Sequence, residues 1–202
     1  MLDSSATRLI RPLLLVVAKR LLAMNVSANA LTFFAFGAGL AASACIAFGH
    51  FGLGAALIAL SRLCDGLDGA VARLTQATDR GGFLDITLDF LFYASVPLAF
   101  AVAQPLQNAL AAASLLAAFM GTATSFLAFA TIAAKRGLAS AAYPDKSFYF
   151  LGGLTEATET LLFFLAMCIW PTHFAVLAYA FAALCGLTVL ARLYWGYVAF
   201  AD

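Results

Sequence analysis

The sequence is poor in charged side chains, and this scarcity excludes most classes of soluble protein. Only 10% of its 202 residues are charged, 64% are hydrophobic, and the mean hydropathy is +0.98. Neither a soluble globular domain nor a disordered chain has this composition. The net charge of +1, with no basic patch, gives no indication of nucleic-acid binding. The composition indicates an all-α integral membrane protein.

The cysteine patterns of disulfide frameworks and zinc sites are also absent. Four cysteines stand singly in apolar segments, without a CxxC spacing: Cys45, Cys64, Cys168 and Cys185. Isolated cysteines of this kind are typical of small buried apolar positions. These cysteines therefore give no indication of a disulfide or a zinc site in this chain.

The first 25 residues predict a helix that lies on the membrane surface. Their apolar core at 13–18 is short and is followed by Lys19 and Arg20, with no small-residue cleavage site, so the segment does not resemble a signal peptide. On a helical wheel, basic residues oppose apolar ones: Arg8, Arg11 and Lys19 against Leu9, Ile10, Leu13, Val16, Val17 and Leu21. We expect an interfacial amphipathic helix over 1–25. A membrane-adjacent tail without function is the alternative.

Six apolar segments follow, each near the roughly 20 residues that cross a bilayer. We expect spanning helices at residues 30–49, 52–73, 82–103, 106–134, 147–170 and 174–197. No internal repeat or low-complexity linker divides the chain. The sequence thus predicts one domain over 1–202, in which 30–197 form a six-helix bundle after the interfacial helix.

Basic residues near the predicted helix ends gather on one side of the membrane. They are Arg8, Arg11, Lys19, Arg20, Arg73, Arg80, Lys135, Arg136 and Lys146. The breaks at 50–51, 104–105 and 171–173 carry no lysine or arginine. By the positive-inside rule, we expect both termini and the segment 65–89 at the cytoplasmic side of an inner or plasma membrane.

Five of the chain's ten acidic residues fall between positions 65 and 89, in the stretch DGLDGAVARLTQATDRGGFLDITLD, and four of them stand at helical spacing. Asp65 and Asp68 are three residues apart, and Asp85 and Asp89 are four apart, so each pair lies on one face of its own helix. The break between the pairs predicts a tight hairpin of two antiparallel helices, which brings all four carboxylates to one depth. Such carboxylates repel one another unless cations hold them together. Two divalent ions would do so, and oxygen-only ligation favours Mg²⁺ or Mn²⁺.

The same stretch carries eight residues at fixed offsets: Asp65, Asp68, Gly69, Ala72, Arg73, Gly81, Asp85 and Asp89, with seven residues between Arg73 and Gly81. This pattern resembles the signature of the CDP-alcohol phosphatidyltransferase family. The resemblance implies a divalent-metal-dependent enzyme of phospholipid biosynthesis. Such an enzyme transfers a phosphatidyl or related substituted phosphate group from a CDP-linked lipid, such as CDP-diacylglycerol, to an alcohol acceptor and releases CMP.

The resemblance also implies roles for the four aspartates. Asp65, Asp68 and Asp85 would be metal ligands. Asp89 would be both a neighbour of the second ion and the catalytic general base that takes the proton of the acceptor hydroxyl. The implied cofactor is thus a pair of Mg²⁺ or Mn²⁺ ions.

Five further residues are implied as contacts of the CDP group: Asn29, Thr32, Gly69, Arg73 and Thr78. Gly69 leaves the helix face bare, and Arg73 can fork onto phosphate oxygens one turn later. Two of these residues have simpler interpretations. Asn29 or Ser27 could cap a helix, and Thr78 could be a turn residue.

The acceptor is less defined by the sequence. Candidate contacts are Lys135, Lys146, Glu156 and Arg192. Membrane topology alone is the favoured explanation of the two lysines. Arg192, inside the last span, is a functional candidate unless it snorkels to the interface or pairs with an acid. Glu156 would repel a phosphate and suit a polyol or amine acceptor, unless Arg192 neutralises it.

Two other functions compete with the enzyme. A cation transporter also uses acids within the membrane, but here they lie at one end and no polar residues continue the path. A structural membrane protein leaves the aspartate cluster unexplained. For the enzyme, the expected partners are the CDP-lipid, the alcohol and membrane lipids, with a homodimer possible.

Overall fold

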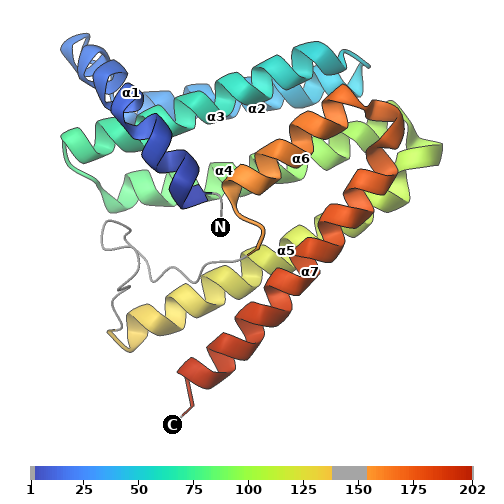
Figure 1. The fold of residues 1–202 in the computed structure, drawn as a ribbon. Coiled ribbons are helices and arrows are strands. Elements are labelled where there is room, and N and C mark those ends of the chain that lie inside the picture. Colours follow the sequence, from blue (N-terminus) through green and yellow to red (C-terminus); the bar gives the residue numbers. More distant parts are fainter. Residues whose placement is uncertain (1–2, 138–153, 202) are drawn as a thin grey trace.

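The computed structural model describes residues 3–137 and 154–201, and this part of the chain is helical throughout, with no strand. Figure 1 shows the elements in order: α1 (Asp3–Ala23), α2 (Ala28–Ala47), α3 (Phe51–Leu74), α4 (Asp79–Ala103), α5 (Pro105–Lys135), α6 (Ala157–Ile169), the short 3-10 helix η1 (Pro171–His173) and α7 (Phe174–Ala199). The all-α fold class is therefore confirmed.

Hydroxyl side chains and one proline set the helix starts. Ser27 caps α2, because its Oγ accepts a hydrogen bond from the Ala30 amide at 3.2 Å, so Asn29 is not the cap. Thr78 caps α4 in the same way, accepting from the Gly81 amide at 3.1 Å. Pro105 begins α5, where a missing amide hydrogen costs nothing.

Four helices are long and apolar enough to cross a membrane: α2, α4, α5 and the run formed by η1 and α7. Helix α3 is long enough as well, with 24 residues, but Arg62, Asp65, Asp68 and Arg73 interrupt its apolar surface. A helix that keeps this many charges within a bilayer needs partners for them inside the bundle. Those partners are found between α3 and α4.

The fifth expected span, residues 147–170, is wrong in its N-terminal part. Helix α6 starts only at Ala157, and residues 154–156 are not helical, while 147–153 lie outside the described residues. The cause is a capping box, in which Glu156 and Glu159 bond to each other's backbone amides. The resulting 13 residues cover about 20 Å, less than the roughly 30 Å of the hydrocarbon layer.

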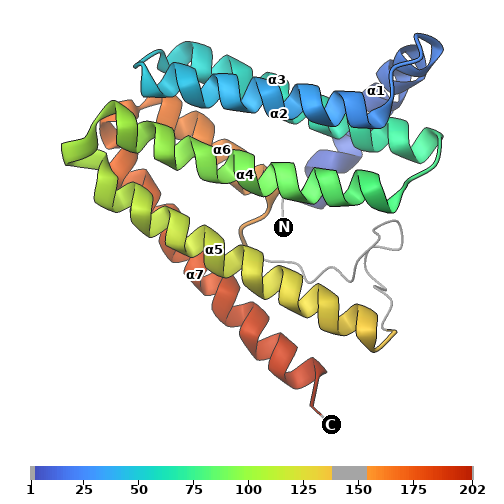
Figure 2. The same ribbon diagram turned by 180° about the vertical axis from the view of Figure 1, so that it is seen from behind.

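Helices α3 and α4 run antiparallel, as expected, but they do not form the expected tight hairpin (Figures 1 and 2). Among the described elements, the two are not a closely packed pair; α2 packs against both of them. Charged side chains of α3 and α4 lie between them instead. Helix α5 packs against α4 and α7, and α6 packs against α3.

The hydrophobic core is aromatic and extends toward the end of the bundle where α6 turns into α7. Its largest fully buried side chains are Phe92, Phe100, Phe164, Phe174 and Phe181. The rings of Phe100 and Phe174 stack with centroids 4.4 Å apart. This packed end fixes the helix directions and leaves the opposite end, where α3 meets α4, for polar groups.

Helix α1 crosses the outside of α3. Ala18 of α1 is fully buried beside Leu67 and Val71 of α3, in a second, smaller apolar cluster. Val17, Leu21 and Leu22 of α1 also pack there. Leu13 and Val16 remain exposed, and side chains of residues 3–9 and 11 are not among those described. The interfacial, amphipathic character of α1 stays a prediction.

Candidate active site

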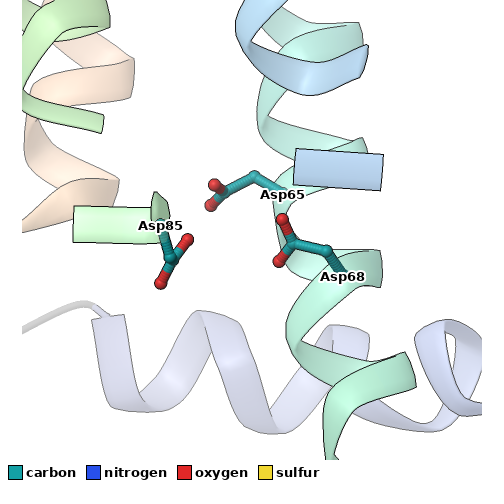
Figure 3. A group of neighbouring side chains, drawn as sticks. All are labelled: Asp65, Asp68 and Asp85. Atoms are coloured by element: carbon teal, nitrogen blue, oxygen red, sulfur yellow. The ribbon is translucent and has the colours of Figure 1, made fainter. Parts of the chain in front are cut away.

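Three of the four motif aspartates converge between α3 and α4. Asp65 and Asp68 reach out from α3 and Asp85 from α4, and the carboxylates point toward one another in Figure 3. One ligand oxygen from each lies within 4.8 Å of the others. This spacing suits oxygen ligands that share a cation. Each oxygen bound to Mg²⁺ or Mn²⁺ lies within about 2.6 Å of the ion, so two oxygens bound to the same ion lie within about 5 Å of each other. We call these three residues the aspartate trio.

The burial of Asp68 fits a cation in the trio. Its side chain is only 5% exposed, and its Oδ2 atom is buried without a hydrogen-bond partner. A buried carboxylate oxygen with no donor is costly, and a bound cation is one of the ordinary ways in which such an oxygen is stabilised. The residues present therefore fit a divalent ion with oxygen ligands.

Asp89 lies one turn beyond Asp85 on α4 and outside the trio. Its Oδ1 accepts a hydrogen bond from Nη1 of Arg62 at 2.6 Å, and the same Nη1 lies 3.6 Å from Asp65 Oδ2. Arg62 is a site residue that the motif does not include. The sequence does single it out in another way, because it is a charged residue inside an expected span and, three residues before Asp65, lies on the face of α3 that carries the motif.

The first turns of α2 and α4 bring together two residues implied as CDP contacts. A Cβ atom added to Gly81 would lie 3.2 Å from Thr78 Oγ1 and 3.4 Å from Asn29 Oδ1. The glycine thus allows both polar side chains to approach the start of α4. Thr32, one turn further along α2, is buried and contacts Asp68. Thr32 therefore borders the trio, and Asn29 and Thr78 lie beside Gly81, one turn before Asp85.

Gly69 and Arg73 also lie together. A Cβ added to Gly69 would be 3.3 Å from Nη1 of Arg73, so the guanidinium lies against the bare face of α3. Arg73 itself is exposed and lines a large cavity together with Asp85 and Asp89. A planar cation with five donors, next to open backbone, is suited to phosphate oxygens.

The cavity has a volume of about 450 Å³ and is lined mainly by α4, α5, α6 and α7, together with Arg73 of α3. On one side Asp85 and Asp89 of α4 face it. Glu156 and Arg192 belong to the same lining. Three of the sequence-derived acceptor candidates can be placed: Glu156 and Arg192 line the cavity, whereas Lys135 ends α5 and is not a lining residue. Lys146 lies outside the described residues.

Arg192 is buried within the bundle, with 8% of its surface exposed. Its Nη1 donates to the backbone oxygen of Thr122 on α5 at 2.9 Å, while its Nε has no partner among the described residues. Glu156 interacts with it electrostatically. The neighbouring amide of Thr155 donates to Thr188 Oγ1 on α7 at 3.2 Å, which fixes the start of α6 next to α7.

Known proteins share this architecture. Inner membrane protein YnjF of Escherichia coli (strain K12) is 48% identical over 198 residues, which cover 98% of this chain and 96% of that protein. The solved structure of Mycobacterium tuberculosis phosphatidylinositol phosphate synthase (PgsA1) with CDP-DAG bound has a TM-score of 0.73 at 22% identity, covering 91% of this chain and 93% of that one. The same synthase in complex with manganese and citrate gives a TM-score of 0.71 at 22% identity, covering 91% of this chain and 88% of that one.

The likeness to the synthase, at this identity, concerns the fold. The curated relative supports integration in a membrane, in agreement with the apolar helices. The family is shown by a sequence model of CDP-alcohol phosphatidyltransferases, which matches residues 25–191 and so includes the aspartate trio, Asp89 and every residue that lines the cavity except Arg192. The chain belongs to the CDP-alcohol phosphatidyltransferase family and is an enzyme of that class.

Proposed function

We propose that this enzyme transfers a phosphatidyl or related substituted phosphate group from a CDP-linked lipid, such as CDP-diacylglycerol, to an alcohol and releases CMP. The observation that carries the proposal is the aspartate trio next to a cavity large enough for an acceptor. Asp85 of the trio and the neighbouring Asp89 both line this cavity. The neighbour crystallised with CDP-DAG supports the choice of donor. A cation transporter or a structural protein has no comparable support.

The trio is the proposed binding site of Mg²⁺ or Mn²⁺, and a second ion would lie toward Asp89. When bound, the ions would offset the charge that develops on the pyrophosphate and on the departing CMP. The unpartnered Oδ2 of Asp68 and the manganese complex of the neighbour support divalent-ion use.

The CDP group is proposed to bind at the starts of α2 and α4. Asn29 and Thr78 offer an amide and a hydroxyl beside Gly81. Thr32 lies next to the trio, and Arg73 lies against Gly69, where its guanidinium can bind the diphosphate. The cap that Thr78 provides to α4 is compatible with this contact, since a hydroxyl has two acceptor lone pairs.

Asp89 is proposed as the general base. It lines the cavity beside Asp85, so an alcohol there can place its hydroxyl within reach of the carboxylate. As the alcohol oxygen forms its bond to the phosphorus next to the lipid, the bond from that phosphorus to the CMP oxygen breaks. The hydroxyl proton passes to Asp89, and CMP leaves with the electron pair of the broken bond.

The acceptor is proposed to be a polyol or an amino alcohol without a phosphate. Arg192 is the cavity's buried cation among the lining residues, and Glu156 lies close enough to offset its charge. A phosphate dianion would leave water without meeting an unpaired buried cation in this pair, and the loss of hydration of such a charge costs several kcal/mol. Uncharged hydroxyl groups avoid this cost, and an ammonium group would be attracted by Glu156.

We further propose that the chain crosses the membrane six times: at the four apolar helices, at α3, and in a crossing that ends with α6, which alone is shorter than the hydrocarbon layer. The link from α3 to α4 and the ends of α5 and α7 lie at one end of the bundle in Figure 1, and Arg73, Arg80, Lys135 and Arg136 belong to that end. The positive-inside rule assigns this end, the active site and both termini to the cytoplasm. Helix α1 would then lie on the cytoplasmic surface.

The test is a transfer assay with purified protein, CDP-diacylglycerol, Mn²⁺ or Mg²⁺, and a panel of acceptors that pairs each free alcohol with its phosphorylated form. CMP release and a new lipid of the mass of phosphatidyl plus acceptor are expected, and EDTA should abolish both. Asp65→Asn should be inactive. Asp79→Asn, at an exposed aspartate at the start of α4, is the matched control and should retain activity. No product from any acceptor would refute the proposal.

A further inference from the structure

Arg62 is a buried cation that the roles assigned above do not use. It lies in α3, one turn before Asp65, and its side chain is 10% exposed. Its Nη1 donates to Asp89 at 2.6 Å, and its Nη2 donates to Ser61 Oγ at 3.2 Å. Its guanidinium also lies over the ring of Phe92, 4.3 Å from the centroid.

These contacts fix the guanidinium relative to three helices. Ser61 donates to the backbone oxygen of Ala35 on α2 at 2.7 Å, so the hydroxyl that accepts from Arg62 is itself anchored. Phe92 on α4 is fully buried and supports the flat face of the guanidinium. A guanidinium held in this way has little freedom to move with its hydrogen-bond partner. The guanidinium therefore determines the position of that partner.

That partner is Asp89, whose position would otherwise be poorly determined. Asp65 and Asp85 carry like charges nearby and would push the Asp89 carboxylate away from α3. Arg62 holds one oxygen of this carboxylate, Oδ1, while the side chain of Asp89 is 28% exposed and lines the acceptor cavity. One carboxylate oxygen is thus fixed on a rigid cation, and the group keeps access to the cavity.

We propose that Arg62 is a positioning residue for Asp89, which sets the direction from which the carboxylate meets the acceptor hydroxyl. This inference rests on the proposed function, because it assumes that Asp89 is the base. A base that is held in place does not populate unproductive rotamers, and correct orientation of a catalytic group contributes a large part of the rate enhancement. Without Arg62, the like charges around Asp89 would turn it away from the acceptor.

The alternative is a purely structural ion pair between α3 and α4. Loss of such a pair would reduce the amount of folded protein but not the turnover of the molecules that fold. A positioning role affects the turnover of each folded molecule. It requires both the positive charge and the N–H donors of Arg62 to lie beside Asp89. The two roles therefore differ in kcat per folded molecule.

The first experiment compares Arg62→Met, which keeps the length of the side chain, with Arg62→Lys, which keeps the charge but loses the fork. Active-site concentration is measured by binding of CDP-diacylglycerol. We expect Arg62→Met to lower kcat per site by about 10- to 100-fold, the range found for residues that orient a catalytic shell, with the KM for CDP-diacylglycerol within threefold. Arg62→Lys should recover a part of this loss.

Arg80→Met, at an exposed arginine at the start of α4, is the matched control and should leave kcat unchanged. An unchanged kcat per site in Arg62→Met would overturn the inference, and so would a variant in which only the KM for CDP-diacylglycerol rises. If Arg62→Met does not fold, Arg62→Lys decides alone. A lysine variant with full kcat per site would show that the fork has no positioning role.

A second experiment tests the pair without any activity. Thermal unfolding in EDTA is measured for Arg62→Met, Asp89→Asn and the double variant. Each single variant leaves a buried charge without its partner, so we expect the double variant to lose clearly less than the sum of the single losses. Additive losses would show that the residues are not coupled. If the wild type transfers no lipid, the proposed function fails and the positioning role fails with it, whereas coupling in unfolding would still establish the pair.

Discussion

Asp68 and Asp89 are carboxylates of one site, but the structure gives them different surroundings. Asp68 is almost fully buried and has an oxygen without a hydrogen-bond donor, whereas Asp89 is partly exposed, is bonded to Arg62 and faces the cavity. The first environment suits a metal ligand, and the second suits a group that meets the acceptor. Each therefore predicts a different defect when its charge is removed.

Asp89→Asn should abolish most turnover while leaving donor binding intact. An amide cannot take the hydroxyl proton, and loss of a general base typically lowers kcat by about 10²- to 10⁴-fold. Titration of the variant with CDP-diacylglycerol in the presence of Mn²⁺ should give a Kd within threefold of the wild type. A variant with normal kcat would contradict the role of Asp89, because the base would then be another group.

Glu156→Gln should shift acceptor preference toward phosphorylated alcohols. The amide keeps the size of the side chain and removes the charge that offsets Arg192, so the cavity becomes more positive. We expect the ratio of kcat/KM for glycerol 3-phosphate to that for glycerol to rise by at least tenfold, equivalent to about 1.4 kcal/mol. Glu159→Gln controls for damage to the shared capping box. The same ratio in wild type and Glu156→Gln would remove Glu156 from the account of specificity.

The residues of the motif were predictable because their spacing has one geometric meaning. Two aspartates at i, i+3 and two at i, i+4 must share helix faces, and a short break must return the second helix to the first. Arg62 was missed because the pattern was read for acids alone. Its pairing with Asp89, 27 residues away, depends on the tertiary arrangement of α3 and α4.

At the scale of elements, most helix bounds follow from apolar runs and turn residues, whereas α6 does not. Hydropathy extends the fifth span back to residue 147, but the helix begins at Ala157 because Glu156 and Glu159 form its cap. A capping box in an apolar region is a local hydrogen-bond pattern that average hydropathy does not detect. The distance between α3 and α4 could not be predicted from the sequence either, because it depends on α2, which packs against both helices.

The contact between α2 and α4 predicts unequal effects of two glycines in α2. A Cβ added to Gly39 would collide with the ring of Phe92, whereas one added to Gly37 would meet nothing within 4 Å. We expect Gly39→Ala to destabilise the protein by about 1–3 kcal/mol, as other overpacked cores do, and to lower activity, since Phe92 also supports Arg62. Gly37→Ala is the control.

Thermal unfolding in detergent, combined with the transfer assay, measures this difference. Gly37→Ala should unfold at the same temperature as the wild type or slightly higher, because alanine favours a helix over glycine by up to about 1 kcal/mol. Equal behaviour of the two variants would mean that α2 and α4 do not approach each other at Gly39.

The whole molecule has two unlike ends. One holds the aromatic core and the connections without lysine or arginine, and the other holds the aspartates, the basic residues and the start of the acceptor cavity. Composition and the distribution of basic residues were sufficient to predict this polarity, because both follow from the bilayer as solvent. They were not sufficient to predict the cavity, which depends on how α5 packs against both α4 and α7.

The proposed orientation can be measured with a membrane-impermeant maleimide on intact cells. Two variants place a thiol at opposite ends of the bundle: His50→Cys, between α2 and α3, and Gln76→Cys, between α3 and α4. Both positions are exposed. We expect position 50 to react from outside and position 76 only after permeabilisation, with the unaltered chain as background. Labelling of position 76 in intact cells would place the active site on the wrong side for a CDP-lipid made in the cytoplasm.

The central claim is that the carboxylates of α3 and α4 together bind the divalent ion that the transfer needs. Its most direct test is an anomalous difference map from crystals grown with Mn²⁺ and CDP-diacylglycerol. We predict a peak bound by oxygens of Asp65, Asp68 and Asp85, next to the diphosphate, and loss of that peak in Asp68→Asn. Manganese elsewhere, or a diphosphate bound away from the three aspartates in a crystal of active enzyme, would contradict the account.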